Sequence, residues 1–187
     1  DGPDSTEPAR FGASVVDDTL RPLPAGLRIA VKLRTRIADG LAVGSLIDGA
    51  VAANVAGKSG LTIAAGSPVR GRIRRLERYT DPFPYFVVAL EFTEVEVEGV
   101  RYRFYADLLE TDSLPGLTRT LQVSDTMESK SIGGGVLQIA SGSISSAPSE
   151  KLWLPDLPGV AVFFVKSGKL NVPQGFRTAW KTRSLKQ

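Results

Sequence analysis

The acid–base chemistry open to this chain depends on carboxylates, because the chain contains neither His nor Cys. Their absence removes the commonest general base, the thiolate nucleophile and the usual zinc ligands. Ser-His-Asp and Cys-His catalysis is therefore excluded. No phosphate-binding or dinucleotide-binding glycine motif follows a strand, since residues 133–135 (GGG) lack a downstream Lys-Ser/Thr. We expect no cofactor and no metal.

One predicted strand carries an acidic stripe, which consists of Glu91, Glu94, Glu96 and Glu98. Glycoside cleavage needs two facing carboxyl groups about 5–10 Å apart, one of them in an apolar pocket. Glutamates along one strand are more often a solvated edge, and these could pair with Arg101 and Arg103 across a hairpin. A carboxylate-dependent carbohydrate-active enzyme stays an alternative, and no residue is assigned a catalytic role.

Basic side chains suggest a second chemistry, the binding of an anionic polymer such as nucleic acid or cell-wall polymer. The candidates are Lys32, Arg34, Arg70, Arg72, Arg74, Lys181 and Arg183. An aromatic platform of Tyr79, Phe83 and Tyr85 follows the middle group and could stack on bases. The net charge of +3 does not by itself indicate a polyanion partner. The alternative is that the basic residues are solvated outer faces of strands and the aromatic residues close a barrel end.

The basic residues belong to a repeated sequence motif, here called the repeated phrase, that occurs three times. It reads LPAGLRIAVKLRT from residue 23, IAAGSPVRGRIRR from 63 and VPQGFRTAWKTRS from 172. Each copy has an apolar residue three positions before a Gly, then an alternating run. This pattern predicts a Gly turn that begins a strand with one buried and one basic face. In the second copy, Val69 and Ile73 would face inward, and Arg70, Arg72 and Arg74 outward.

Further strands are predicted at 45–55 and 85–99 and in the regular pattern of 159–183. In 85–99, Val88, Leu90 and Phe92 share one parity, whereas Val95 and Val97 share the other. One face cannot bury both sets without an extra residue, so we expect a bulge or bend near Thr93-Glu94. Gly99 is then expected to turn the chain into a hairpin over 100–110.

These elements predict an all-β fold, a single closed or partly open β-barrel, with a β-sandwich as the alternative. Residues 1–20 are expected to form an acidic extended arm, and 21–187 a single β-rich domain. That domain would contain a Ser/Gly-rich connection at 111–150, with a short helix or irregular segment, and a closing hairpin at 159–183. No apolar run approaches the roughly 20 residues that span a bilayer, so no transmembrane span is predicted.

The stretch Pro24–Arg74 resembles a known family. Pro24-Ala25-Gly26 before an alternating strand, followed by Ile63-Ala64-Ala65-Gly66-Ser67 and Gly71, is similar to the barrel domain of the TrbI family. That family supplies the outer-membrane channel subunits of type IV secretion systems, and the same pattern occurs in uncharacterised exported bacterial proteins. Ala64 stands where the family usually has Pro, and the chain shows neither the membrane-crossing helix nor the long periplasmic arm. The resemblance implies an envelope-located β-barrel and does not support channel activity.

Together these patterns favour an exported, non-enzymatic cell-envelope protein that acts as a binding or structural module. The polar residues 1–10 would then follow a removed signal or lipid anchor, with trimming of the chain as the alternative. The expected location is the periplasm or outer envelope, with lipid anchoring as one option. The expected partners are envelope proteins or an anionic polymer.

Overall fold

Alternating apolar and polar residues build the strands of this protein, whose computed structural model describes residues 19–119 and 159–185. In Arg28–Leu33, for example, Ile29, Val31 and Leu33 are buried and Arg28 and Lys32 are exposed. The strands are β1 (Arg21–Pro22), β2 (Arg28–Leu33), β3 (Ile37–Ala38), β4 (Leu46–Val51), β5 (Val55–Ala56), β6 (Thr62–Ile63), β7 (Pro68–Tyr79), β8 (Tyr85–Val97), β9 (Val100–Arg103), β10 (Ala106–Thr111), β11 (Leu117–Arg119), β12 (Val160–Val165), β13 (Asn171–Val172) and β14 (Arg177–Thr182).

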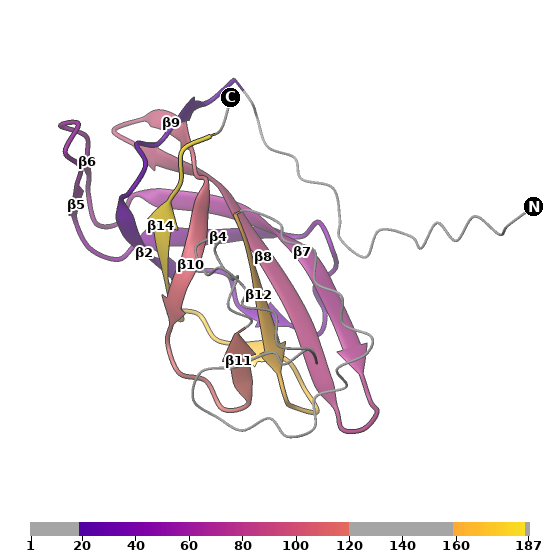
Figure 1. The fold of residues 1–187 in the computed structure, drawn as a ribbon. Coiled ribbons are helices and arrows are strands. Elements are labelled where there is room, and N and C mark those ends of the chain that lie inside the picture. Colours follow the sequence, from indigo (N-terminus) through magenta and orange to yellow (C-terminus); the bar gives the residue numbers. More distant parts are fainter. Residues whose placement is uncertain (1–18, 120–158, 186–187) are drawn as a thin grey trace, which may run out of the picture.

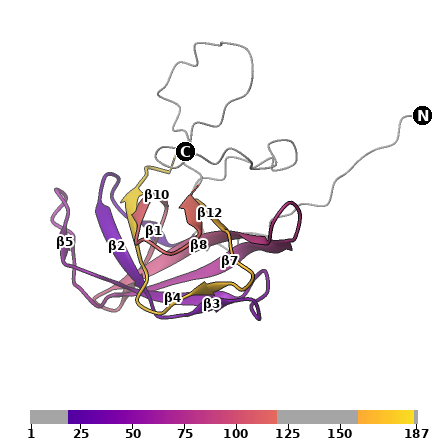
Figure 2. The same ribbon diagram turned by 90° about the horizontal axis from the view of Figure 1, so that it is seen from below.

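The main sheet runs in the order β1-β9-β8-β7-β4-β2-β14-β10 and curls into an open half-barrel (Figures 1 and 2). Within the described ranges the structure is all-β and contains no helix, which confirms the predicted fold class. Strand β8 has two neighbours on the edge away from β7. Its first half pairs with β12, and its second half pairs with β9.

The division of β8 falls at the predicted bulge. Arg70 of β7 pairs with Glu94, and Gly71 pairs with Phe92, so Thr93 is the extra residue. This bulge shifts the phase of β8, and as a result both Leu90 and Val95 are buried in the same core. The turn from β8 to β9 has positive φ at Glu98 (50°) and Gly99 (78°), the conformation of a tight two-residue hairpin. The predicted hairpin is confirmed for β9, whereas β10 leaves it to pair with β14.

The predicted closing hairpin at 159–183 is wrong. Strand β12 pairs with β8 and β11, and β14 pairs with β2 and β10, so these two strands do not pair with each other. Between them, β13 pairs with β3 and carries the chain away from β12. The physical reason is burial: β12 has almost no polar outer face and fits beside the equally apolar first half of β8.

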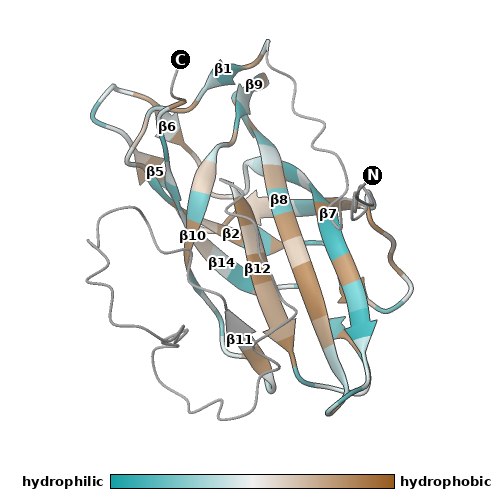
Figure 3. Ribbon diagram, turned by 45° about the vertical axis from the view of Figure 1, so that its right-hand side comes forward, coloured by the Kyte–Doolittle hydropathy of each residue, from teal (hydrophilic) through white to brown (hydrophobic). Residues whose placement is uncertain are grey.

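The inner face of the half-barrel holds the main core. Three aromatic side chains meet there edge to face: Phe92, Phe104 and Trp180, with ring centroids 5.4–5.9 Å apart. Trp180 is fully buried, and its Nε1–H donates to Thr178 Oγ1 at 2.8 Å. A second cluster lies on the opposite face of β8 and β12, around Tyr85, Val87 and Val162. The two strands are therefore apolar on both faces and form the brown band of Figure 3.

The expected connection at 111–150 is described only at its start. Residues 117–119 form strand β11, which pairs with the end of β12. The rest of that connection lies outside the described residues. So does the expected acidic arm, apart from its last two residues.

Candidate anion-binding site

The repeated phrase builds one turn unit, and the structure contains four copies of it in the described residues. Each unit has a Gly with φ of 86–88°, the value that the third residue of a type II turn requires. The Gly N–H donates to the carbonyl of one residue on a neighbouring strand, at 2.8 Å. That residue's N–H donates back to the carbonyl after the Gly, at 2.9 Å. The pairs are Gly26 with Thr182, Gly44 with Ile73, Gly66 with Val51 and Gly175 with Leu33.

Sequence reasoning missed the unit at Gly44. Its segment, LAVGSLIDGAV from residue 41, has an apolar residue (Leu41) three positions before the Gly, as the other copies do. Three positions after the Gly it has Ile47, where two of the other copies also have an apolar residue. At the positions where those copies carry basic residues, however, it carries Ala50 and Ala52. The apolar spacing and the Gly were the signal that could have revealed it, because the turn geometry depends on them and not on the charges.

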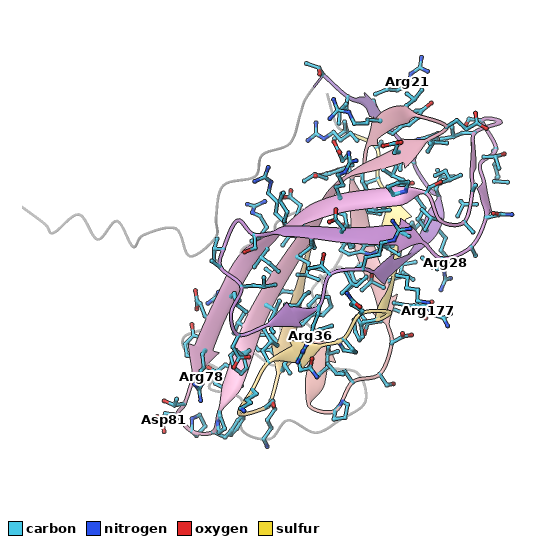
Figure 4. All side chains as sticks on the ribbon, turned by 180° about the vertical axis from the view of Figure 1, so that it is seen from behind. Arg21, Arg28, Arg36, Arg78, Asp81 and Arg177 are labelled. Carbon is cyan, nitrogen blue, oxygen red and sulfur yellow. The ribbon has the colours of Figure 1, made fainter. Side chains whose placement is uncertain are left out.

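The four strands that these turns begin lie next to one another in the sheet, in the order β7-β4-β2-β14. On the outer face of the β2–β14 pair, Lys32 lies opposite Arg177, and Arg28 lies opposite Lys181. We call these four exposed cations the basic face. They surround a centre formed by Ala30 and Ala179, which also lie opposite each other. Arg28 and Arg177 project from the same side of the molecule (Figure 4).

The basic face borders the acidic residues of β10, where Asp107 lies directly opposite Lys181. Arg28 pairs with Glu110 of β10, and Asp112 accepts a hydrogen bond from the Arg177 backbone N–H at 2.9 Å. Lys32, Arg34 and Lys181 make no ion pair with any described residue. Arg183, beyond the end of β14, pairs with Asp107 at 3.2 Å. Of the predicted binding residues, the structure thus brings Lys32, Arg34, Lys181 and Arg183 to one region, and adds Arg28 and Arg177.

The basic residues of β7 lie elsewhere, since β4 separates β7 from β2. Arg70 contacts Glu94 at 2.8 Å and Glu96 at 3.7 Å, and the hydrogen bond that Arg70 donates to Glu94 raises the pKa of Arg70. Arg72 is half-buried on the same strand, with Glu91 as its cross-strand neighbour. The seven predicted residues therefore do not form one surface.

The expectation that Arg74 faces outward into solvent is wrong. A second bulge between β7 and β8 lies in β7, where Arg74 is the extra residue between Ile73 and Arg75. Its side chain is only 9% exposed and contacts the equally buried Glu91 at 2.7 Å. Burying either charge without an opposite charge beside it would cost roughly several kcal/mol of stability. The two charges are therefore buried together. Arg74 is not available to a polymer.

Glutamates of the acidic stripe form ion pairs with arginines. Glu91 contacts Arg74, while Glu94 contacts both Arg70 and Arg101, the latter at 3.3 Å. The pairing of the stripe with Arg101 across the β8–β9 hairpin agrees with the sequence-based interpretation. Among the residues that the structure describes, the stripe faces cations, and it does not present two carboxyl groups to each other across a pocket.

The predicted aromatic platform forms, but away from the basic face. Tyr79 and Tyr85 stack at 4.8 Å with an interplanar angle of 6°, and Phe83 lies 5.8 Å from Tyr85. Lys166 Nζ lies 4.3 Å from the Phe83 ring centroid. The cluster lies at the end of the β7–β8 hairpin, which Arg78 and Asp81 mark in Figure 4. Tyr85 is only 6% exposed, so this cluster offers little free ring surface for stacking.

Hydrogen bonds tie the platform to a buried cation. The Tyr79 hydroxyl and the fully buried Arg75 both donate to Glu77, and Arg75 Nη2 lies 2.8 Å from its carboxylate. Burial and the Glu77 contact raise the pKa of Tyr79, and burial raises the pKa of Tyr85. Burial acts against the charge of Arg75, but the bond and charge of Glu77 outweigh it and raise the pKa of Arg75. These groups form a packed structural cluster.

Searches for metal-binding clusters, for membrane-spanning helices and for similar proteins give no further indication of function. In the described part of the chain, no cluster of three or more metal-ligating side chains is found. No helix there has the length and apolarity to cross a membrane. Comparisons of this chain with protein families, with curated proteins and with solved structures found no match.

Proposed function

We propose that this protein is a non-enzymatic binding module of the cell envelope, and that its basic face binds an anionic polymer. The observation that carries this proposal is the cross-strand pairing of like charges, Arg28 with Lys181 and Lys32 with Arg177. Like charges directly opposite each other in a sheet are destabilising. Two such pairs, one near each end of the face, are therefore better explained by binding than by stability.

Strand β7 provides an internal comparison. Arg70, on the outer face of β7, lies opposite Glu94 and forms an ion pair with it. The outer face of this strand therefore carries charges of opposite sign on neighbouring strands. Between β2 and β14, by contrast, the residues that lie opposite each other carry like charges, and their acidic neighbours lie on β10. Four residues of strand span about 13 Å, and neighbouring strands are about 5 Å apart. An extended polyanion along the two strands would therefore meet two cations near each end of the face.

The assignment to the envelope rests on the resemblance of Pro24–Arg74 to TrbI-type and exported proteins. The glycines of that pattern, Gly26 and Gly66, are the glycines of two turn units. This supports a related barrel architecture, and with it a periplasmic or outer-envelope location, with a lipid anchor as one form of attachment. The enzyme alternative receives less support, because arginines hold Glu91 and Glu94.

The test is titration with single-stranded DNA at several salt concentrations. Four phosphate contacts predict a salt slope of about −3, which lowers affinity roughly 50-fold between 50 and 200 mM salt. The double variant Arg177→Ser/Lys181→Ser should reduce that slope by about half. The matched control, Arg70→Ser/Arg72→Ser, removes the same charge from β7 and should leave the slope unchanged. Absence of binding at low salt, or equal effects of both variants, would overturn the proposal.

A further inference from the structure

A hollow of about 490 Å³ adjoins the basic face. Its lining includes Ala50, in β4, and Ala52, just after that strand. Lys32 and Arg34 also line it, as do Gly66 and Gln174 from two of the turns. All four copies of the repeated turn unit thus contribute to one concavity.

The hollow exists because the Gly44 unit departs from the pattern. Ala50 lies directly opposite Lys32 in the sheet and occupies the position that carries Lys or Arg in the other three copies. A long basic side chain there would fill the space and repel Lys32. The turn adds room, since a Cβ on Gly66 would meet no atom within 4 Å. Small residues on one strand therefore leave the cations of its neighbour facing an open space.

The lining of the hollow has a definite chemistry. Lys32 and Arg34 contribute two positive charges without ion pairs to described residues, and Gln174 contributes an amide. Among the residues that the structure describes, no carboxylate lines the hollow, and the remaining lining is aliphatic or Gly. Guanidinium and ammonium groups recognise phosphate, and aliphatic walls favour a ligand that carries carbon beside its charge.

We propose that this hollow binds a phosphate ester, with its phosphate at Lys32 and Arg34 and its apolar part over Ala50 and Ala52. The inference rests on the proposed function, because Lys32 belongs to both sites. It goes further by assigning a discrete pocket at the end of the basic face, where one phosphate ester unit of the polymer would be held. The phosphate and the carbon next to it would be recognised together.

The test uses the full chain and three small probes: phenyl phosphate, inorganic phosphate and phenol, titrated by NMR. Phenyl phosphate should bind about tenfold more tightly than inorganic phosphate, and phenol should not bind measurably. A tenfold difference corresponds to about 1.4 kcal/mol. Covering about 55 Å² of apolar surface supplies this amount. Equal affinity for the two phosphates would overturn the proposal, because it would show that charge alone is recognised.

Two variants locate the site. Ala52→Leu fills the hollow without changing charge and should remove the preference for phenyl phosphate. The matched control Ala56→Leu makes the same change at an exposed position of β5, outside the hollow and the basic face, and should keep the preference. Arg34→Gln should weaken phenyl phosphate binding at least fivefold, and this prediction holds even if Ala52→Leu fails to fold.

Binding of single-stranded DNA separates this proposal from the previous one. If Ala52→Leu keeps phenyl phosphate binding at wild-type strength, the pocket is refuted. If the pocket variants lose phenyl phosphate while the salt slope with DNA persists, both assignments are supported. If DNA does not bind but phenyl phosphate binds and responds to Ala52→Leu, the polymer proposal fails and the phosphate ester pocket stands.

Discussion

Neutralising Glu91 should destabilise the protein far more than neutralising Glu94, although both glutamates link β7 to β8. The two ion pairs have almost equal lengths: 2.7 Å for Arg74–Glu91 and 2.8 Å for Arg70–Glu94. They differ in burial. Both side chains of the first pair are 9% exposed, whereas Arg70 is 50% exposed. The comparison therefore holds the length of the ion pair nearly constant and varies its exposure to solvent.

Glu91→Gln would leave the Arg74 cation buried without its counter-charge, which costs about 3–5 kcal/mol. For a chain of this size, that corresponds to a fall in melting temperature of roughly 6–20 °C. Glu94→Gln would free Arg70 and Arg101, both about half exposed, to be solvated. The expected cost is about 0–1 kcal/mol, because water screens and solvates these groups.

Equilibrium unfolding in urea measures both variants against the parent chain. The double variant Arg74→Met/Glu91→Met removes both charges and keeps the volume, so it should recover most of the stability lost in Glu91→Gln. If Glu91→Gln costs no more than Glu94→Gln, the pair is not buried as described. If the double variant is as unstable as the single one, the loss comes from packing and not from an uncompensated charge.

Four other predictions concern pH (two of them), backbone packing and the unity of the fold. Because the chain has no His, its melting temperature should be nearly constant between pH 5.5 and 7.5, and a shift of many degrees would reveal a perturbed carboxyl group. The pKa values of Tyr79 and Tyr85 are raised in the folded chain. The unfolded chain therefore ionises first, and stability should fall as pH rises above about 10, less steeply in the Tyr-to-Phe variants. Gly71→Ala would place a Cβ 2.2 Å from the Glu91 carbonyl oxygen, so it should lower the free energy of unfolding by roughly 1–3 kcal/mol in urea titration. A chain ending at Ser149 lacks β12 and β14 and should show no cooperative thermal transition; a normal transition would contradict a single β-rich domain.

The sequence predicted which side chains of a strand face inward and where a bulge changes this pattern. It did not predict which strands pair with each other. The bulge at Thr93 followed from the change of parity between Leu90 and Val95. The bulge at Arg74 left a similar signal, because the buried Ile73 and the next inward residue, Leu76, are an odd number of residues apart. The alternating arginines before it concealed that signal.

The candidate site was predicted only in part for the same reason. Lys32 and Lys181 stood out because their copies of the phrase are basic, but the pairing of β2 with β14 is what adds Arg28 and Arg177. A hairpin was expected after residue 159 because neighbouring segments often pair. Burial on both faces of β12 favoured β8 instead, and no local pattern encodes that choice.

The turn units also impose an order on assembly. Gly44 and Gly66 connect β4 and β7, which follow each other in the chain, so their loops close at small entropic cost. Gly26 and Gly175 connect β2 and β14, and the contact of Leu27 with Thr182 joins residues 155 positions apart. Such non-local contacts slow folding and are made late. We expect β4, β7 and β8 to form the nucleus and β14 to dock last. During synthesis, the surface made by β2 and β14, where we propose that the polymer binds, cannot exist until β14 has been made.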